Sequence, residues 1–277
     1  MTNRIDRKFT ELKEAGRCGI IPFITAGDPS LDATVPVMHQ LVRAGADLLE
    51  LGVPFSDPMA DGPVIQASSE RALERGVGIR QVLSMVETFR QEDDSTPVIL
   101  MGYMNPIERL GHEAMAAAAA AAGVDGLLLV DCPPEEADSL HSALREQDIH
   151  SIYLIAPTTT QARIETICQA ASGFLYYVSL KGVTGASQSG AGDLESQLSR
   201  IRAASQLPVA VGFGIKNAAS AAAVARVTDA VVIGSALVDT IKSAASVAEA
   251  VALAGEFIQP VSAALLEYNE PVALTRD

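Results

Sequence analysis

Cysteine and histidine are scarce in this chain of 277 residues, with three of the first and four of the second. Cys18, Cys132 and Cys168 are odd in number and lack the spacing of a metal site, so we expect reduced thiols in a cytoplasmic protein. No two histidines have the spacing of metal ligands either. The sequence therefore predicts no metal site, and it contains no pattern for a nicotinamide or flavin cofactor.

Basic residues are also few, since 20 Lys and Arg stand against 34 Asp and Glu and give a net charge of -14. Nucleic acids and anionic membranes are bound largely through Lys and Arg, so neither is an expected partner. A phosphorylated small molecule is not excluded, because backbone N–H groups at a helix N-terminus can hold a phosphate without a basic side chain.

Long apolar runs are missing as well. No run of about 18 apolar residues occurs, which argues against a membrane span, and the segment Met1 to Phe9 is too polar for a secretory signal. A composition of 48% hydrophobic and 19% charged residues is that of a globular protein with a full core. No linker or change of composition divides the chain, so we expect one domain over residues 1–277.

Short apolar segments alternate with segments of helical periodicity along the whole chain. After an amphipathic helix over 2–16, the expected strands are 19–25, 48–51, 97–101, 125–130, 150–155, 174–178, 208–211 and 230–233. The expected helices are 31–44, 68–91, 113–122, 135–146, 161–171, 194–204 and 217–226, followed by further helical segments.

Strict alternation of strands and helices implies a parallel sheet with right-handed crossovers. Eight such units in about 250 residues match a closed (β/α)₈ TIM barrel, here with an extra helix at the N-terminus. An open, doubly wound sheet is the alternative. It would need a Gly-rich phosphate fingerprint after an early strand, and the sequence has none.

The most informative stretch runs from Asp47 to Gln66. Glu50 lies inside an apolar strand, where a carboxylate is costly to desolvate unless it has a partner or a task. In the barrel mouth its pKa should rise, which suits proton transfer near neutral pH; a Glu paired with a Lys or Arg is the alternative. The following loop is broken by glycines and prolines and carries Asp57 and Asp61. Physical reasoning leaves open whether Asp61 is a catalyst or a turn former.

Active sites of such barrels lie at the C-terminal ends of the strands, and the loops after strands seven and eight often bind phosphate. Those loops contain Gly212-Phe213-Gly214-Ile215 and Gly234-Ser235. Glycines let the backbone approach an anion closely, and Ser235 adds a hydroxyl. We therefore expect a phosphate site, with ordinary turn glycines as the alternative. Other polar or aromatic residues near strand ends are Phe23, Thr25, Tyr103, Asn105, Asp131 and Tyr176.

The segment from Leu180 to Gly192 is rich in Gly and Ser and has little to pack. It is typical of a mobile lid that closes over a ligand and excludes water. Thr184 is then the residue expected to meet the site on closure. A connection without a role is the alternative.

Together these residues resemble the tryptophan synthase alpha subunit family, over essentially the whole chain. Leu49 to Gln66 matches the family signature almost residue for residue, and this motif is highly specific. Shorter matches are Tyr177-Val-Ser179, Gly182-Val-Thr-Gly185, Gly212-Phe-Gly-Ile215 and Ile233-Gly-Ser235. The resemblance implies a lyase that cleaves indole-3-glycerol phosphate by a retro-aldol reaction, without a cofactor of its own.

The resemblance also implies roles for individual residues. Glu50 would be the general acid–base, and Asp61 would interact with the indole N–H and stabilise the intermediate. The indole pocket would be lined by Phe23, Tyr103, Leu128 and Tyr176. The phosphate would be held by Gly185, Phe213, Gly214, Gly234 and Ser235, with Thr184 meeting the substrate from the lid.

The family further implies a beta subunit that carries pyridoxal phosphate, receives indole through a tunnel and forms an alpha2beta2 tetramer. The expected contact surface includes Asp57-Pro58, Asn105-Pro106 and Pro133-Pro134. One departure is visible: many members have Arg after the lid serine, where this chain has Leu180. Lid closure and its coupling to the partner are then expected to differ in detail, with activity kept.

Three other functions are weighed against this one. A phosphosugar isomerase or aldolase-like barrel lacks support, because no Lys lies where a strand end would place a Schiff base. A catalytically idle subunit would need neither Glu50 nor Asp61. A stand-alone lyase that releases free indole is poorly separated from the synthase subunit by sequence.

Overall fold

Eight parallel strands close into a barrel in the order in which they occur along the chain. The computed structural model describes residues 2–178, 188–212 and 214–267. The strands are β1 (Gly19–Thr25), β2 (Leu49–Gly52), β3 (Val98–Gly102), β4 (Gly126–Leu129), β5 (His150–Ile155), β6 (Leu175–Val178), β7 (Val209–Gly212) and β8 (Ala230–Ile233). The predicted (β/α)₈ barrel is confirmed, and the open sheet is wrong because β1 pairs with both β2 and β8. That residues 1–277 form one domain stays a prediction.

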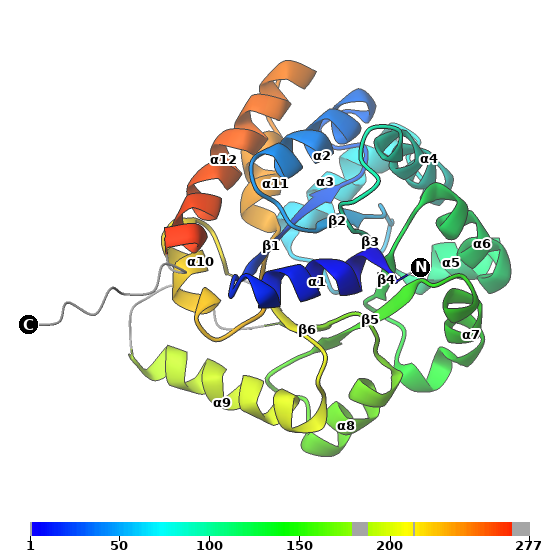
Figure 1. Ribbon diagram of the computed structural model, residues 1–277. Coiled ribbons are helices and arrows are strands. Elements are labelled where there is room, and N and C mark those ends of the chain that lie inside the picture. The colour runs from blue at the N-terminus through cyan, green and yellow to red at the C-terminus, as the bar shows by residue number, and fades with distance from the viewer. Residues whose placement is uncertain (1, 179–187, 213, 268–277) are drawn as a thin grey trace, which may run out of the picture.

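Most of the helices form a ring around the barrel, and two of them cover its ends (Figure 1). The helices are α1 (Arg4–Glu14), α2 (Thr34–Arg43), α3 (Pro63–Glu74), α4 (Ile79–Arg90), α5 (Met104–Leu110), α6 (His112–Ala122), α7 (Asp138–Glu146), α8 (Gln161–Ala170), α9 (Gln188–Ala204), α10 (Ala218–Ala225), α11 (Ser235–Ile241) and α12 (Val247–Glu267). Short 3₁₀ turns at Leu31–Ala33 and Pro134–Glu136 precede α2 and α7.

Two expected helices differ from the structure, and one helix was not expected. The single helix over 68–91 is two helices, α3 and α4, because the chain turns between them at Gly76 with φ 77°. Helix α3 begins at Pro63, in the first turn where proline is well tolerated. Helix α9 begins at Gln188 rather than near residue 194, so residues 188–192 of the expected lid are helical. The short helix α5 was not expected.

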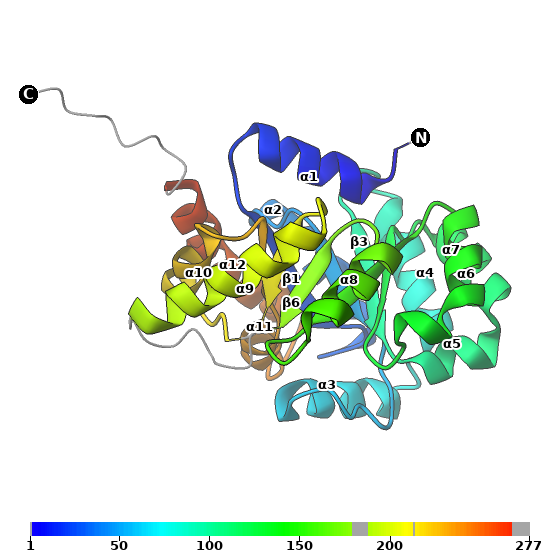
Figure 2. The same ribbon diagram turned by 90° about the horizontal axis from the view of Figure 1, so that it is seen from below.

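Helix α1 covers one end of the barrel, and α3 lies across the other (Figure 2). Ile5, Phe9 and Leu12 recur at helical spacing, are buried, and belong to the apolar cluster inside the barrel. The other buried residues of that cluster lie in the strands or, for Leu48 and Phe174, directly before them: Ile21, Leu48, Ile99, Leu128, Ile152, Phe174, Tyr176, Ala210, Ala230 and Val232. The interior is therefore a packed core closed by α1, and a site can open only at the opposite end.

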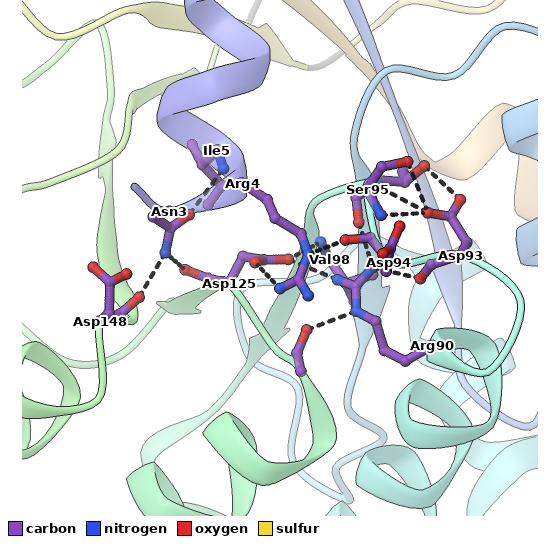
Figure 3. Close-up of polar contacts among 12 residues, drawn as sticks. Asn3, Arg4, Ile5, Arg90, Asp93, Asp94, Ser95, Val98, Asp125 and Asp148 are labelled. Atoms are coloured by element: carbon purple, nitrogen blue, oxygen red, sulfur yellow. Dashed lines mark hydrogen bonds and ion pairs between the residues drawn. The ribbon is translucent and has the colours of Figure 1, made fainter. Parts of the chain in front are cut away.

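Polar contacts fasten α1 to this closed end (Figure 3). Asp125, 2% exposed, accepts hydrogen bonds from Arg4 at 2.9 Å and Arg90 at 2.7 Å, and its Oδ2 also accepts from the backbone N–H of Val98 at 2.8 Å. The Asn3 side chain donates to the backbone carbonyl of Asp125 at 3.0 Å. These contacts join α1, β3 and α4 at the end of the barrel away from α3.

Helix α12 is, among the described residues, the one helix long and apolar enough to cross a membrane by length and composition. It does not contain a run of about 18 apolar residues, because polar residues such as Glu249 and Glu256 interrupt it. Its buried residues recur every three or four positions, and the helix packs on α2, α10 and α11. Those residues are Ala250, Ala254, Ile258, Val261 and Leu265. We therefore interpret α12 as the last helix of the outer ring.

Candidate active site

Strand β2 turns the Glu50 side chain into the barrel. Side chains alternate along a strand, so Glu50 faces inward with Leu48, while Leu49 and Leu51 pack outward against the helices. In the sheet, Glu50 is paired with Phe23 on one side and with Ile99 on the other. Glu50 is only 2% exposed to solvent. Glu50 therefore lies on the inner wall above the apolar core.

The carboxyl group of Glu50 is buried without a compensating contact. Neither carboxyl oxygen has a hydrogen-bond partner among the described residues. Burial, followed by the negative charge of Asp61, raises the pKa of Glu50 from 4.5 to about 8. The described chain offers Glu50 no Lys or Arg partner, and Lys181 lies outside it. A carboxyl group with this pKa exchanges protons readily near neutral pH.

Asp61 reaches the same region from the loop after β2. Its Oδ2 accepts a hydrogen bond of 3.0 Å from the hydroxyl of Tyr103, which follows β3. Burial raises the pKa of Asp61, and the Tyr103 hydrogen bond opposes that rise. Asp61 thus has a hydrogen-bond donor that stabilises its charged form, whereas Glu50 has none among the described residues. The Tyr103 hydrogen bond therefore makes Asp61 easier to ionise than burial alone would allow, whereas nothing among the described residues opposes the raised pKa of Glu50.

Asp57 is separate from this pair. It is exposed, and its Oδ2 accepts a hydrogen bond of 2.6 Å from the neighbouring Ser56 hydroxyl. Of the three acids on this strand and loop, the structure brings together Glu50 and Asp61.

Apolar and aromatic side chains surround the two acids. Phe23 is 6% exposed on β1, Leu128 is fully buried on β4, and Tyr176 is 8% exposed on β6. Burial, with the charges of Glu50 and Asp61 adding to it, raises the pKa of Tyr176 well above 10, so this hydroxyl stays neutral. The predicted indole-pocket residues therefore lie on the inner wall or at the mouth of one barrel.

Two glycines make room for these rings. A Cβ on Gly52 would lie 2.6 Å from Cζ of Phe23, and a Cβ on Gly212 would overlap the hydroxyl of Tyr176. Any larger residue would therefore displace one of these rings. Sequence reasoning assigned Gly52 no role, because a glycine's neighbours across a sheet are not visible from its own segment.

The expected phosphate loops lie at the same end of the barrel. Gly214 follows β7 with φ 79°, a conformation that favours glycine. Gly234 follows β8, and the exposed Ser235 begins the short helix α11. This arrangement matches the loop-and-short-helix phosphate sites of other barrels.

Three predicted site residues, Thr184, Gly185 and Phe213, lie outside the described residues. The same is true of residues 180–187 of the expected lid.

Three other strand-end residues make structural contacts. Thr25 is buried against Ser68 of α3, with 2.6 Å between their hydroxyl oxygens. Asp131 accepts a hydrogen bond of 2.8 Å from the backbone N–H of Met104 at the start of α5. Asn105 is exposed within α5. Among the described residues, none of the three forms a hydrogen bond with Glu50 or Asp61.

Gln66 is a further residue to which sequence reasoning gave no role. Its side-chain amide contacts the loop that carries Asp61. Within the described part of the chain, no group of three or more His, Cys, Asp and Glu side chains is placed to hold a metal ion.

Comparisons with known proteins all point to one family. A family model described as Tryptophan synthase alpha chain matches residues 9–264. The tryptophan synthase alpha chain of Thioalkalivibrio sulfidiphilus is 60% identical over 239 residues, or 86% of this chain and 90% of the relative. That of Bordetella pertussis is 58% identical over 250 residues, or 90% of this chain and 88% of the relative.

Solved structures agree with the sequence comparison. Tryptophan synthase subunit alpha from Legionella pneumophila has a TM-score of 0.89 at 45% identity, covering 96% of this chain and 100% of that one. Tryptophan synthase from Mycobacterium tuberculosis, in an open form with BRD0059 bound, has a TM-score of 0.85 at 32% identity, covering 95% and 99%. The chain therefore belongs to the tryptophan synthase alpha chain family.

Proposed function

We propose that this chain cleaves indole-3-glycerol phosphate to indole and glyceraldehyde 3-phosphate, in the last steps of L-tryptophan biosynthesis. It acts as a lyase by a retro-aldol reaction, as membership of the family implies. The observation that carries the mechanism is the buried Glu50 carboxyl group, which has no hydrogen-bond partner among the described residues and a pKa of about 8.

Glu50 moves the protons. Because its pKa is about 8, it is mostly protonated at pH 7 and donates this proton to ring carbon C3 of the indole. The resulting carboxylate takes the proton of the hydroxyl on the carbon attached to C3. The bond between C3 and that carbon then breaks, its electron pair returns to the ring, and the hydroxyl carbon becomes the aldehyde of glyceraldehyde 3-phosphate.

Asp61 stabilises the intermediate. Protonation of C3 places positive charge on the ring nitrogen, and the Asp61 carboxylate accepts a hydrogen bond from this N–H. Tyr103 holds the carboxylate in place through its hydroxyl. A fixed negative charge that faces developing positive charge in a water-poor site is an effective form of transition-state stabilisation.

The substrate is held at its two ends. Phe23, Leu128 and Tyr176 supply the apolar walls for the indole ring, and backbone at Gly214 and Gly234 with Ser235 binds the phosphate. We assign the rest of the substrate site to Thr184, Gly185 and Phe213, which lie outside the residues that the structure describes. Anchoring the phosphate fixes the ring above Glu50, because one rigid barrel carries both sites.

A beta subunit is the partner that the family implies, and we propose that two alpha and two beta chains assemble and that indole passes between them. Around Asp57 and Pro58, the apolar side chain of Met59 is 84% exposed, as expected of a surface that a partner covers. Pro134 is buried, so of the expected Pro133-Pro134 contact only Pro133 is accessible. A stand-alone lyase is not favoured, since the relatives are tryptophan synthase alpha chains.

The chain itself needs no cofactor for this chemistry, because the acid and base are side chains; pyridoxal phosphate belongs to the beta subunit. We further propose that the protein is cytoplasmic, because thiols such as its three free cysteines stay reduced in that compartment.

The test is indole release from indole-3-glycerol phosphate by wild type and Glu50→Gln, each with and without a beta subunit. We expect the wild type to be active and stimulated by the partner, and Glu50→Gln to be slower by roughly 10²–10⁴-fold or more. Activity without any response to the partner would favour the stand-alone lyase. A Glu50→Gln protein as active as wild type would remove Glu50 from the mechanism.

A further inference from the structure

The loop that carries Asp61 has little packing to hold it. Ser56, Asp57, Met59 and Ala60 are all exposed, and Asp61 itself is half-buried. Apolar burial therefore contributes little to the position of the Asp61 carboxylate. Phe55, at the start of the loop, stacks on Tyr103 with ring centroids 5.1 Å apart, and the remaining contacts are polar and come from two sides.

One side is β3. The hydroxyl of Tyr103 donates to Oδ2 of Asp61 at 3.0 Å and accepts from the backbone N–H of Ala60 at 3.1 Å. The other side is α3, through Gln66. Its Nε2 donates to the backbone carbonyl of Asp61 at 2.9 Å and to that of Pro58 at 3.4 Å. Both partners are carbonyl oxygens, so it is the NH₂ group of the amide that faces the loop.

Gln66 is itself held by a helix that is firmly fixed to the barrel. Ser68 donates to the carbonyl of Ile65 at 2.7 Å, so its hydroxyl accepts the bond from Thr25 at the end of β1. One turn further on, Arg71 forms a two-pronged ion pair with the buried Asp28 at 2.7 and 2.8 Å. Helix α3 thus provides a rigid base for the amide of Gln66.

Apolar contacts fix the same helix between the walls of the site. Ile65 of α3 belongs to one buried cluster with Phe23 of β1 and Val238 of α11. Because α3 packs on both β1 and α11, its position is tied to the indole wall and to the helix that begins at Ser235.

We propose that Gln66 is a positioning residue for the reaction, which fixes the Asp61 carboxylate by clamping the backbone of its loop to α3. The inference rests on the proposed catalytic role of Asp61. The carboxyl group of Glu50 has no hydrogen-bond partner among the described residues, and the side-chain amide of Gln66 donates both of its hydrogen bonds to the loop. Its effect on the rate must therefore pass through Asp61.

A double-mutant cycle tests this coupling. Gln66→Met keeps the length of the side chain and removes both donors. In the wild-type background we expect kcat to fall about tenfold, because a displaced catalytic group loses much of its effect, while KM changes less than twofold. In the Asp61→Asn background the same substitution should change kcat less than twofold, since coupled residues are not additive.

Gln66→Glu supplies a second readout. Its carboxylate would face two carbonyl oxygens, and protonation would restore one donor. We expect its kcat relative to wild type to rise as pH falls from 8 to about 5.5. The matched control is Gln81→Met on α4, which removes one side-chain hydrogen bond, to Gly78, away from the site. Its kcat should equal that of wild type.

The outcomes separate the inference from the proposed function. An inactive wild type, or an Asp61→Asn variant with full kcat, would overturn the role of Asp61 and the inference with it. An impaired Asp61→Asn variant with equal losses from Gln66→Met in both backgrounds would overturn the inference alone. A Gln66→Met protein with wild-type kcat would also overturn it.

Discussion

The hydroxyl of Tyr103 donates to Oδ2 of Asp61 at 3.0 Å, across 42 residues of sequence. It joins the end of β3 to the loop after β2 and supplies the one side-chain donor that Asp61 has among the described residues. Because this bond lowers the pKa of an acid that burial raises, Tyr103 helps to keep Asp61 ionised. The same contact both positions the carboxylate and sets its charge.

Tyr103→Phe should therefore lower kcat/KM and move the acidic limb of the pH profile to higher pH. The aromatic ring is kept, and loss of a hydrogen bond to a charged group corresponds to roughly 10- to 100-fold. Without the donor the pKa of Asp61 rises further, so its charge is lost at a higher pH as the solution is acidified. The measurement is kcat/KM for indole release between pH 5 and 9. Tyr153→Phe, whose hydroxyl contacts His141 on another part of the barrel, is the control. A profile for Tyr103→Phe that coincides with wild type would contradict this assignment.

Glu50 should make the folded protein less stable as pH rises. Its pKa is about 8 when folded and near 4.5 when unfolded, so the folded state binds the proton more tightly. The contribution to stability is fully present below about pH 4.5 and is lost as pH rises through 8. In Glu50→Gln this dependence is absent, so the difference in unfolding free energy between variant and wild type should shift in favour of the variant by several kcal/mol, on the order of 5, between pH 4.5 and 9. Urea denaturation at both pH values measures it, and any constant effect of the amide cancels. A difference that does not change with pH would mean that the Glu50 pKa is not raised.

The activity of wild type should follow the same titration. If Glu50 donates the first proton, kcat/KM must decline as pH rises through about 8, because the acid form of the free enzyme is then lost. Stopped assays of indole release across pH 6 to 10 give the profile. A rate that increases through this range would assign Glu50 to the base form at the start of the reaction.

Gly52→Ala should damage substrate binding without touching either acid. The new Cβ would lie 2.6 Å from Cζ of Phe23, so this ring, which we propose as a wall of the indole pocket, must shift. We expect KM to rise about tenfold and stability to fall by roughly 1–3 kcal/mol from overpacking. Gly78→Ala is the control, because a Cβ there meets only the side-chain oxygen of Gln81 at 3.6 Å. An unchanged KM for Gly52→Ala would show that the Phe23 ring does not border the substrate.

Much of this fold was predictable because strands buried on both faces are continuous apolar runs. The predicted bounds of β1, β5 and β8 match the structure. The helices between β2 and β3 were harder. Four residues, 75–78, separate α3 from α4, with a positive φ at Gly76 and extended backbone at Gly78.

The site was predictable where a residue conflicts with its own segment. Glu50 is conspicuous because an acid interrupts an apolar strand. Asp61 was left open by physical reasoning, since its neighbours come from β3 and α3 and a loop acid looks like a turn former. Gln66 was missed for the same reason. Its role depends on carbonyl groups of the backbone, which leave no pattern in a sequence.

Asp125→Asn should destabilise the protein and leave its chemistry intact. At the closed end of the barrel, the Asp125 carboxylate forms ion pairs with Arg4 and with Arg90, whose side chain is 10% exposed. Its replacement leaves a buried cation without its charge partner, which typically corresponds to about 3 kcal/mol. Asp239→Asn breaks an exposed pair with Lys242 and should change stability by less than about 1 kcal/mol. Urea denaturation measures both, and kcat is compared well below the unfolding temperature. Because α1 and α3 lie at opposite ends of the barrel (Figure 2), kcat of Asp125→Asn should equal that of wild type. A fall in kcat at full folding would mean that the closed end is coupled to the site.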